Sequence, residues 1–200
     1  RYIFMCKIFY IMGKRPSGKD TIYKKLQERN PELRTVGPYT TRPARENEKN
    51  GVEYFFTDEE QLKKMEENGK VIEVRSYNTE CGIWTYFTAD DGQIDLSDYD
   101  YLMIGTLESY QALKRYFGEK SLVPVYIEVE DGLRLERALQ RERKQKNPKY
   151  AEMCRRFLAD TEDFSEENIN RASIRKRFSN KDLATCLNEI EVYMNEVNGK

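Results

Sequence analysis

A short segment near the start of the chain, residues 13–21, constrains the fold more than any other and reads GKRPSGKDT. An apolar run, residues 8–12, precedes it, and a helical pattern over residues 22–29 follows. When a Gly-x4-Gly-Lys loop joins a strand to a helix, its backbone N–H groups and the positive end of the helix can bind phosphate, and Lys19 adds a mobile charge. A short match of this kind also occurs as a turn that ends in an exposed lysine. The flanking strand and helix favour phosphate binding.

The residue after the lysine departs from the usual loop. A serine or threonine normally stands there and offers its hydroxyl to Mg²⁺, but here the residue is Asp20. A hydroxyl for the metal must then come from Thr21, one residue further on. We therefore predict Thr21 as the metal contact, and we predict that the phosphates of ATP are bound by Gly13, Lys14, Ser17, Gly18, Lys19, Asp20 and Thr21.

Histidine is absent from the 200 residues, and the four cysteines lie far apart with no CxxC spacing. A zinc site and a nucleophile activated by histidine are therefore excluded. Arginine, lysine and a bound metal ion remain as the sources of catalysis. Phosphoryl transfer is the reaction that works in this way.

Charge patterning argues against several classes of partner. Charged residues make up 34% of the chain, but the net charge is only −1, so no overall field attracts nucleic acid or an anionic membrane. No apolar run approaches the ~20 residues that a membrane span needs. Scattered cysteines are typical of a reducing compartment. We expect a cytoplasmic protein without a nucleic-acid, membrane or obligate protein partner.

Apolar runs alternate with helical patterns through most of the chain, which is typical of a parallel α/β sandwich. Residues 34–88 depart from this alternation, because strand patterns are expected over residues 34–41, 52–56, 71–74 and 83–88 with only one helical pattern among them. The sequence therefore predicts one α/β domain with three layers, a parallel sheet, and a small mixed α+β insertion.

The segment over residues 40–54 reads TTRPARENEKNGVEY and carries a second cluster of anion-binding side chains. Arg42 and Arg45 lie three residues apart in a loop stiffened by Pro43, with threonine hydroxyls before them. Arginine grips phosphate oxygens with two parallel N–H groups, so this segment can hold a dianion. A solvated charged loop is the plainer interpretation, but it gives no reason for the proline-fixed spacing.

The two segments together resemble guanylate kinases. The Gly-x4-Gly-Lys loop is followed by Thr-Thr-Arg-Pro-x-Arg and then by Gly-Val-x-Tyr-x-Phe. The resemblance implies that Arg42, Arg45 and Tyr54 hold the phosphate of GMP. It continues at Val71-Ile72-Glu73, which is similar to the family's Phe-Ile-Glu, and implies that Glu73 accepts the N1–H and N2–H groups of guanine. Thr85 falls where the family has a hydroxyl that donates to guanine O6.

The resemblance also covers the second half of the chain. Arg137 and Arg141 look like part of the family's lid helix, and Arg156 looks like part of a second lid segment, so all three would reach the transferring phosphoryl group. Asn180 resembles the asparagine that lies against the adenine of ATP. A solvated helix with balanced Glu and Arg pairs would explain the lid arginines equally well.

Some positions depart from the family pattern. Pro38 stands where the family usually has a serine on the GMP phosphate, so we expect Tyr39 or Thr40 to compensate. Ile83 stands where the family has the tyrosine of Tyr-Gly-Thr. In residues 104–109 the family's two aspartates are missing, and Thr106 remains as the predicted GMP contact in that segment.

The resemblance implies a P-loop kinase that transfers a phosphoryl group from MgATP to GMP, giving ADP and GDP. It divides the single domain into a core of about residues 5–33, 98–130 and 165–200, a GMP-binding subdomain of about 34–97, and a helical lid of about 131–164. Two alternatives stay open. One is a binding module of the same fold that has lost catalysis, and the other is a kinase that acts on another phosphorylated acceptor such as a ribose phosphate.

Overall fold

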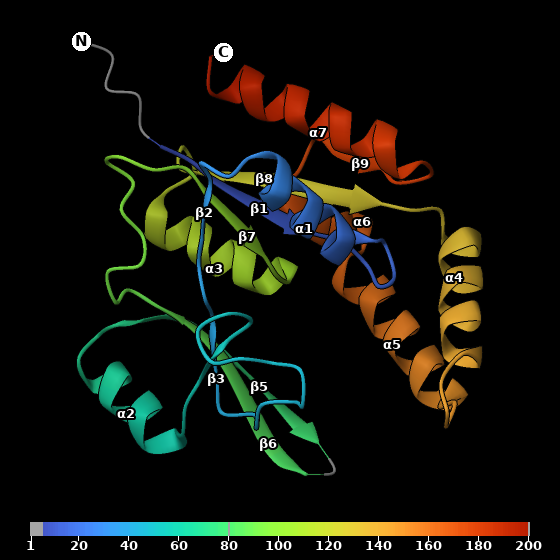
Figure 1. The fold of residues 1–200 in the computed structure, drawn as a ribbon, viewed down its shortest axis with the longest axis horizontal. Coiled ribbons are helices and arrows are strands. Elements are labelled where there is room, and N and C mark those ends of the chain that lie inside the picture. Colours follow the sequence, from blue (N-terminus) through green and yellow to red (C-terminus); the bar gives the residue numbers. More distant parts are fainter. Residues whose placement is uncertain (1–5, 80, 200) are drawn as a thin grey trace.

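The computed structural model of the chain describes residues 6–79 and 81–199, so Met5, the first residue of the predicted core, lies outside the described residues. Its main sheet has five parallel strands (Figure 1). In spatial order these are β2 (Arg34–Thr35), β7 (Tyr101–Ile104), β1 (Ile8–Met12), β8 (Leu122–Glu128) and β9 (Arg177–Ser179). The central strand β1 therefore leads directly into the phosphate-binding loop.

Helices cover both faces of this sheet. Phe9 and Ile11 of β1 pack with α1 (Lys19–Arg29) and α7 (Leu183–Val197). Ile8, Tyr10 and Met12 pack on the other side with α3 (Leu107–Phe117) and α6 (Glu166–Arg171). A strand buried on both faces must be apolar throughout, and β1 is. The predicted three-layer α/β fold is confirmed.

A second sheet lies below the main one in Figure 1 and corresponds to the predicted insertion. Its strand order is β4 (Phe55–Phe56), β3 (Tyr39–Thr40), β6 (Gly82–Ala89) and β5 (Val71–Thr79), and α2 (Glu59–Glu67) packs on one of its faces. The run from 34 to 41 was predicted as one strand, but it is split between the two sheets. The Gln93 side chain binds both backbone groups of Gly37, with the Gly37 N–H donating to Oε1 (2.8 Å) and Nε2 donating to the Gly37 carbonyl oxygen (3.2 Å), and Pro38 has no N–H, so the strand is interrupted between the two sheets.

The split moves the start of the insertion. Because β2 belongs to the main sheet, residue 34 is a few residues too early as the first residue of the inserted unit. The hairpin of β5 and β6 is also longer than predicted: the predicted strands covered residues 71–74 and 83–88. Aromatic rings extend the pairing toward its tip, where the Tyr77 and Tyr86 ring centroids lie 5.8 Å apart.

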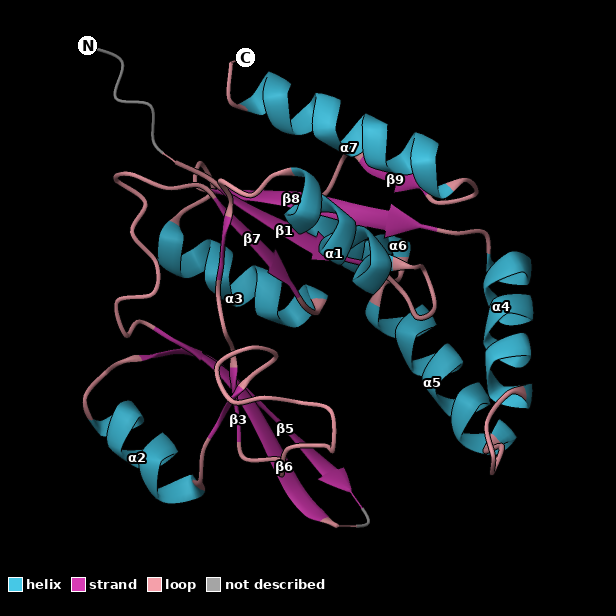
Figure 2. Cartoon of the chain, in the orientation of Figure 1, coloured by secondary structure: helices cyan, strands magenta, loops and turns pink. Residues whose placement is uncertain are grey.

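A second projection from the main sheet consists of α4 (Asp131–Arg143) and α5 (Tyr150–Asp163), which pack against each other (Figure 2). The sequence predicts both of them, as helical patterns over residues 130–146 and 152–163, but it gives no sign of the short α6 that follows. Arg134 is completely buried where α4 meets α5, with its guanidinium carbon 3.9 Å from the centroid of the Phe157 ring. Within the described part of the chain, each helix is too short or too polar to cross a membrane.

Candidate active site

The phosphate-binding loop runs from the end of β1 to the start of α1, as predicted, and its two glycines are fixed by close approach. Gly18 has φ of +82°, and a Cβ atom there would lie 2.5 Å from Asn180 Nδ2. A Cβ atom on Gly13 would lie 2.5 Å from the carbonyl oxygen of Ile127. A side chain at either position would therefore push the loop away from the strands that hold it.

Asn180 braces this loop from β9. Its Nδ2 donates to the Ser17 carbonyl oxygen (2.8 Å), and its own carbonyl oxygen accepts from Arg137 Nη2 (3.1 Å). The residue is buried. The structure thus brings the predicted Asn180 and Arg137 to the loop, where the Asn180 amide holds the backbone in place.

Lys19 begins α1, with its Nζ 3.2 Å from the Asp20 carboxylate. The Lys19 side chain is mostly buried, whereas Asp20 and Thr21 are exposed at the helix start. Among residues 6–79 and 81–199, three or more His, Cys, Asp or Glu side chains nowhere gather as a metal site. Kinase Mg²⁺ needs less, because one or two carboxylates with substrate phosphates and water complete its shell. The Asp20 carboxylate and the Thr21 hydroxyl are oxygen ligands of that kind, so the residues present fit the ion.

Hydrogen bonds and an ion pair among Arg15, Arg134, Asp160 and Thr161, called the latch below, join the loop to the helical projection. The buried Asp160 of α5 accepts from the Arg15 backbone N–H (2.6 Å) and from the Arg15 guanidinium through Nε and Nη2 (2.6–3.2 Å). Arg134 donates from Nη1 to the Arg15 carbonyl oxygen (3.0 Å) and from Nη2 to Thr161 Oγ1 (3.0 Å). Sequence reasoning missed these residues. Arg134 lies one helical turn from Ala138 on the buried side of α4, which only the packing of the helices shows.

The predicted GMP-phosphate segment is built around a buried guanidinium. Arg42 is 3% exposed, and its Nη1 and Nη2 form a fork with the two oxygens of Glu48 (2.9 Å each). Glu48 also accepts from the Arg45 backbone N–H (2.9 Å), while Arg45 itself is exposed beside the buried Arg42. This contact with Arg42 lowers the pKa of Glu48 below its ordinary value. The Tyr54 ring centroid lies 5.4 Å from the Arg42 guanidinium carbon.

The predicted base-reading residues Glu73 and Thr106 are also brought together, through a residue that sequence reasoning missed. Arg75 donates from Nε and Nη2 to the two oxygens of Glu73 (2.9 and 3.3 Å) and from Nη1 to Thr106 Oγ1 (3.2 Å). Glu73 accepts a further hydrogen bond from Thr88 Oγ1 (2.9 Å). The signal for Arg75 was its period-2 spacing from Glu73, which places both on one face of β5.

The structure does not bring Tyr39 and Thr85 to the other predicted GMP contacts. Thr85 pairs with Ser76, and Tyr39 with Phe87, so both face away from Glu73. Thr85 Oγ1 lies 3.0 Å from Ser76 Oγ. Tyr39 is stacked on Phe87 with ring centroids 4.9 Å apart.

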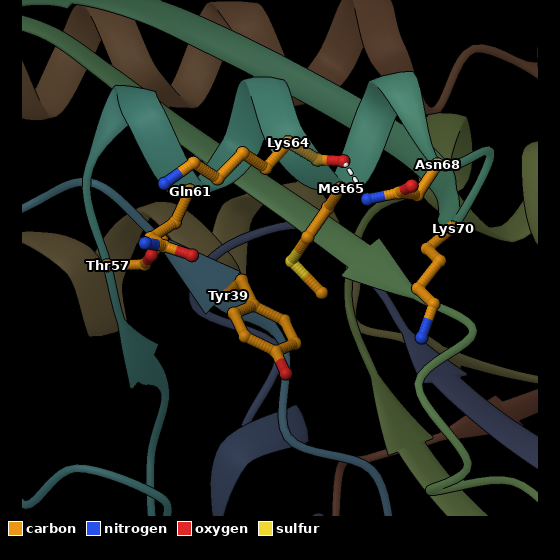
Figure 3. A pocket seen from close by; sticks show the side chains of 7 residues that line it. All are labelled: Tyr39, Thr57, Gln61, Lys64, Met65, Asn68 and Lys70. Atoms are coloured by element: carbon orange, nitrogen blue, oxygen red, sulfur yellow. Dashed lines mark hydrogen bonds between the residues drawn. The ribbon is translucent and has the colours of Figure 1, made fainter.

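Figure 3 shows Tyr39 beneath α2, beside Met65, in a hollow on the face of the inserted sheet that α2 covers. Its hydroxyl donates to Asp91 Oδ2 (2.5 Å). Thr40 lies on the same face of the sheet as Glu73. Its hydroxyl already makes two hydrogen bonds to the backbone, because it donates to the Thr85 carbonyl oxygen and accepts from the Arg42 N–H. Neither side chain therefore compensates for Pro38 in this geometry.

The register of β5 and β6 shows which tyrosine and threonine lie on the face of Glu73. Tyr86 lies opposite Arg75 and Thr88 lies opposite Glu73, so both share the face of Glu73. The Tyr-x-Thr pattern that the resemblance implies is therefore Tyr86-Phe87-Thr88, three residues beyond the predicted position. Tyr86 also contacts the Tyr54 ring edge-on, at 5.8 Å between centroids, which joins the phosphate and base halves of the site.

The remaining lid arginines lie on exposed surfaces. Arg141 is exposed on α4. Arg156 is exposed on α5, where its Nε donates to Glu152 Oε1 (2.6 Å), and Arg155 contacts the same carboxylate. These two arginines lower the pKa of Glu152 to about 2. Of the three predicted lid arginines, the structure brings only Arg137 to the loop.

Comparison with known proteins identifies what this arrangement resembles. A family model described as guanylate kinase matches residues 5–87. A guanylate kinase of Legionella pneumophila is 41% identical over 66 residues, and one of Frankia casuarinae is 40% identical over 63 residues. These alignments cover 33% and 32% of this chain, and 32% and 34% of the relatives.

The fold comparison extends over nearly the whole chain. A crystal structure of guanylate kinase from Anaplasma phagocytophilum superposes with a TM-score of 0.67 at 17% identity, covering 98% of this chain and 88% of that one. The predicted resemblance is confirmed, by sequence over the part that holds the loop and the arginine segment and by fold over the rest. The sequence alignments span about a third of the length of the curated relatives.

Proposed function

We propose that this chain transfers the γ-phosphoryl group of ATP to GMP, giving ADP and GDP. The observation that supports the proposal is that two separate clusters of donor groups suited to phosphate lie in one chain with the guanylate-kinase fold. One is the loop of residues 13–19, and the other is the buried Arg42 fork on the inserted sheet. A phosphotransferase needs such a pair, whereas a module that binds one nucleotide needs only one.

At the donor site, the loop N–H groups and Lys19 hold the β- and γ-phosphates, and Lys19 exchanges its contact with Asp20 for phosphate oxygens. Mg²⁺, when bound, neutralises charge on the transferring phosphates. Asp20 would hold the ion, with Thr21 near enough in sequence to assist through water. A general base is unnecessary, because the acceptor phosphate is already an anion at neutral pH.

At the acceptor site, Arg42 exchanges the Glu48 carboxylate for the phosphate of GMP, a swap that keeps its bidentate geometry. Arg45, Tyr54 and Tyr86 surround the same position. Thr106, Glu73 and Thr88 lie further along the same face, where the base would be placed.

The helical projection completes the site when it closes. Arg137 already touches the backbone next to the loop through Asn180. Closure would carry Arg141 and Arg156 toward the transferring group, where they neutralise charge, and it would exclude water so that ATP hydrolysis does not compete. The reaction needs small-molecule nucleotides and no macromolecular partner.

The test is a coupled assay of ADP release with GMP, dGMP, AMP, UMP and ribose 5-phosphate offered in turn. We expect GMP to stimulate ADP release above the other acceptors. If GMP binds in calorimetry but no acceptor stimulates release, the chain is a binding module and the proposal fails. If ribose 5-phosphate is the best acceptor, the chain is a kinase of the same fold with a different substrate.

A further inference from the structure

The carboxylate that would read guanine is already engaged by an arginine. Arg75 approaches Glu73 side-on, with Nε at 2.9 Å from Oε2 and Nη2 at 3.3 Å from Oε1. The Glu73 side chain is 3% exposed and that of Arg75 is 13% exposed, so water screens this pair only weakly. Thr88 completes the coordination of Oε1.

Two forks compete for one edge of a carboxylate. A guanine that presents N1–H and N2–H to Glu73 needs one lone pair on each oxygen, directed along the same outward edge. The Nε–Nη2 fork of Arg75 uses one lone pair on each oxygen in the same side-by-side way. The edge can serve Arg75 or the guanine pair, but it cannot serve both at once.

Arg75 itself offers donors to a ligand. A guanidinium has five N–H groups, and three of them are used here, two by Glu73 and one by Thr106 Oγ1. The other two, one on each terminal nitrogen, remain for a bound base. Arginine donors suit a carbonyl oxygen, and the 6-oxo group of a purine is such an acceptor.

We propose that Arg75 is a specificity-determining residue that caps Glu73 and reads the 6-oxo group of the acceptor purine, so that the 2-amino group goes unread. The inference rests on the proposed function, since it concerns the acceptor of that reaction. It predicts that the acceptor class is the 6-oxopurine nucleoside monophosphates. GMP and IMP share the 6-oxo group and differ only at the 2-amino group, which makes them the matched pair of probes.

The experiment compares kcat/KM for GMP and IMP in the wild type, Arg75→Lys and Arg75→Met. For the wild type we expect a GMP-to-IMP ratio within about tenfold. Lysine keeps the charge beside Glu73 but cannot occupy both oxygens as a fork, so Arg75→Lys frees part of the edge without leaving a buried carboxylate alone. We expect the ratio to rise at least about tenfold in both variants, through KM for GMP and not through kcat.

A second substitution shows whether the rise in the GMP-to-IMP ratio depends on Glu73. Adding Glu73→Gln to Arg75→Lys should return the ratio to the wild-type value, because the acceptor pair is gone. Arg171→Met is the matched control, since Arg171 pairs with Glu167 on the exposed surface of α6 and should leave the ratio unchanged. A fold defect lowers turnover of both nucleotides together and does not move the ratio.

The proposal is overturned if neither Arg75 variant changes the ratio, or if the wild type already prefers GMP over IMP by about 100-fold or more. Dissociation constants for GMP and IMP are measured by calorimetry on the same proteins. If the wild type turns over no acceptor, the proposed function fails, and the ratio of those dissociation constants still decides the role of Arg75.

Discussion

At the residue scale, the cations that would bind phosphate or base are paired with neighbouring carboxylates. Lys19 contacts Asp20, Arg42 contacts Glu48, and Arg75 contacts Glu73. A buried guanidinium without a partner would cost several kcal/mol, so such pairing is expected wherever an anion site is built from arginine. A phosphate must therefore exchange with a carboxylate at Lys19 and at Arg42, whereas Arg75 can keep its contact with Glu73 and meet a base with its two unused N–H groups.

Lys19→Met tests the donor half of the site. We expect kcat to fall by about 100-fold or more, because a charge that stabilises the transferring phosphates is removed, while GMP binding measured by calorimetry is retained. Lys24→Met on the exposed side of the same helix is the control and should leave kcat unchanged. Loss of GMP binding in a folded Lys19→Met protein would contradict the assignment of two separate sites.

Asp20→Asn tests the metal side of the loop. The amide keeps the shape of the side chain but removes the charge that suits Mg²⁺. We expect the Mg²⁺ concentration for half-maximal activity to rise about tenfold, with most of kcat recovered at saturating Mg²⁺. An unchanged Mg²⁺ requirement would assign Asp20 to pairing with Lys19 alone.

At the element scale, features set by neighbouring residues could be predicted from the sequence, whereas features set by the pairing of strands could not. The loop of residues 13–19 and α1 follow from adjacent sequence, because a strand, two glycines and a helix start are neighbours in the chain. The faces of β5 and β6 depend on register, which is set by contacts between strands. The spacing along the chain therefore favours Thr85, whereas the pairing of Glu73 with Thr88 puts the hydroxyl of Thr88, three residues further on, on the face of Glu73.

Long-range ion pairs are a second class of feature that the sequence could not supply. Arg15 and Asp160 lie 145 residues apart, and nothing in either local segment points to the other. The same holds for Arg134, which looks like any arginine of a solvated helix until α5 covers it. The contacts of Arg15, Arg134 and Asp160 were thus not predicted, although both helices were.

Asp160→Asn tests this latch between elements. Asp160 is buried while the Arg15 side chain is half exposed. When the pair is broken, water can therefore solvate Arg15 but not the side chain at position 160. We expect the free energy of unfolding in urea to fall by about 1–3 kcal/mol and KM for ATP to rise, because the loop loses its backbone anchor at Arg15. Glu162→Gln, on an exposed position of the same helix, should change neither. Unchanged ATP affinity in Asp160→Asn would restrict the latch to a role in stability.

At the scale of the whole molecule, the core of the main sheet contains several buried tyrosine side chains. Tyr10, Tyr110 and Tyr126 all lie in the cluster between the sheet and the α3 side, each at most 1% exposed. Burial raises the pKa of all three above the ordinary value for tyrosine, and that of Tyr126 to about 12. The folded state therefore keeps these hydroxyls neutral in a pH range where the unfolded chain ionises them.

This difference makes the fold sensitive to alkali, with a sign that follows from linkage. A group whose pKa is raised by folding contributes stability that is fully present below its unfolded pKa, near 10, and is lost as pH rises toward the folded value. For Tyr126 the window is about pH 10 to 12.

Tyr126→Phe keeps the ring that stacks on Phe164 and removes the ionisable group. We expect the free energy of unfolding in urea to fall less steeply with pH in this variant, by about 1 kcal/mol per pH unit between pH 10 and 11. Tyr150→Phe, at a position 46% exposed, is the control and should keep the wild-type slope. Equal slopes for the wild type and Tyr126→Phe would show that the Tyr126 hydroxyl ionises as readily in the folded protein as in the unfolded chain.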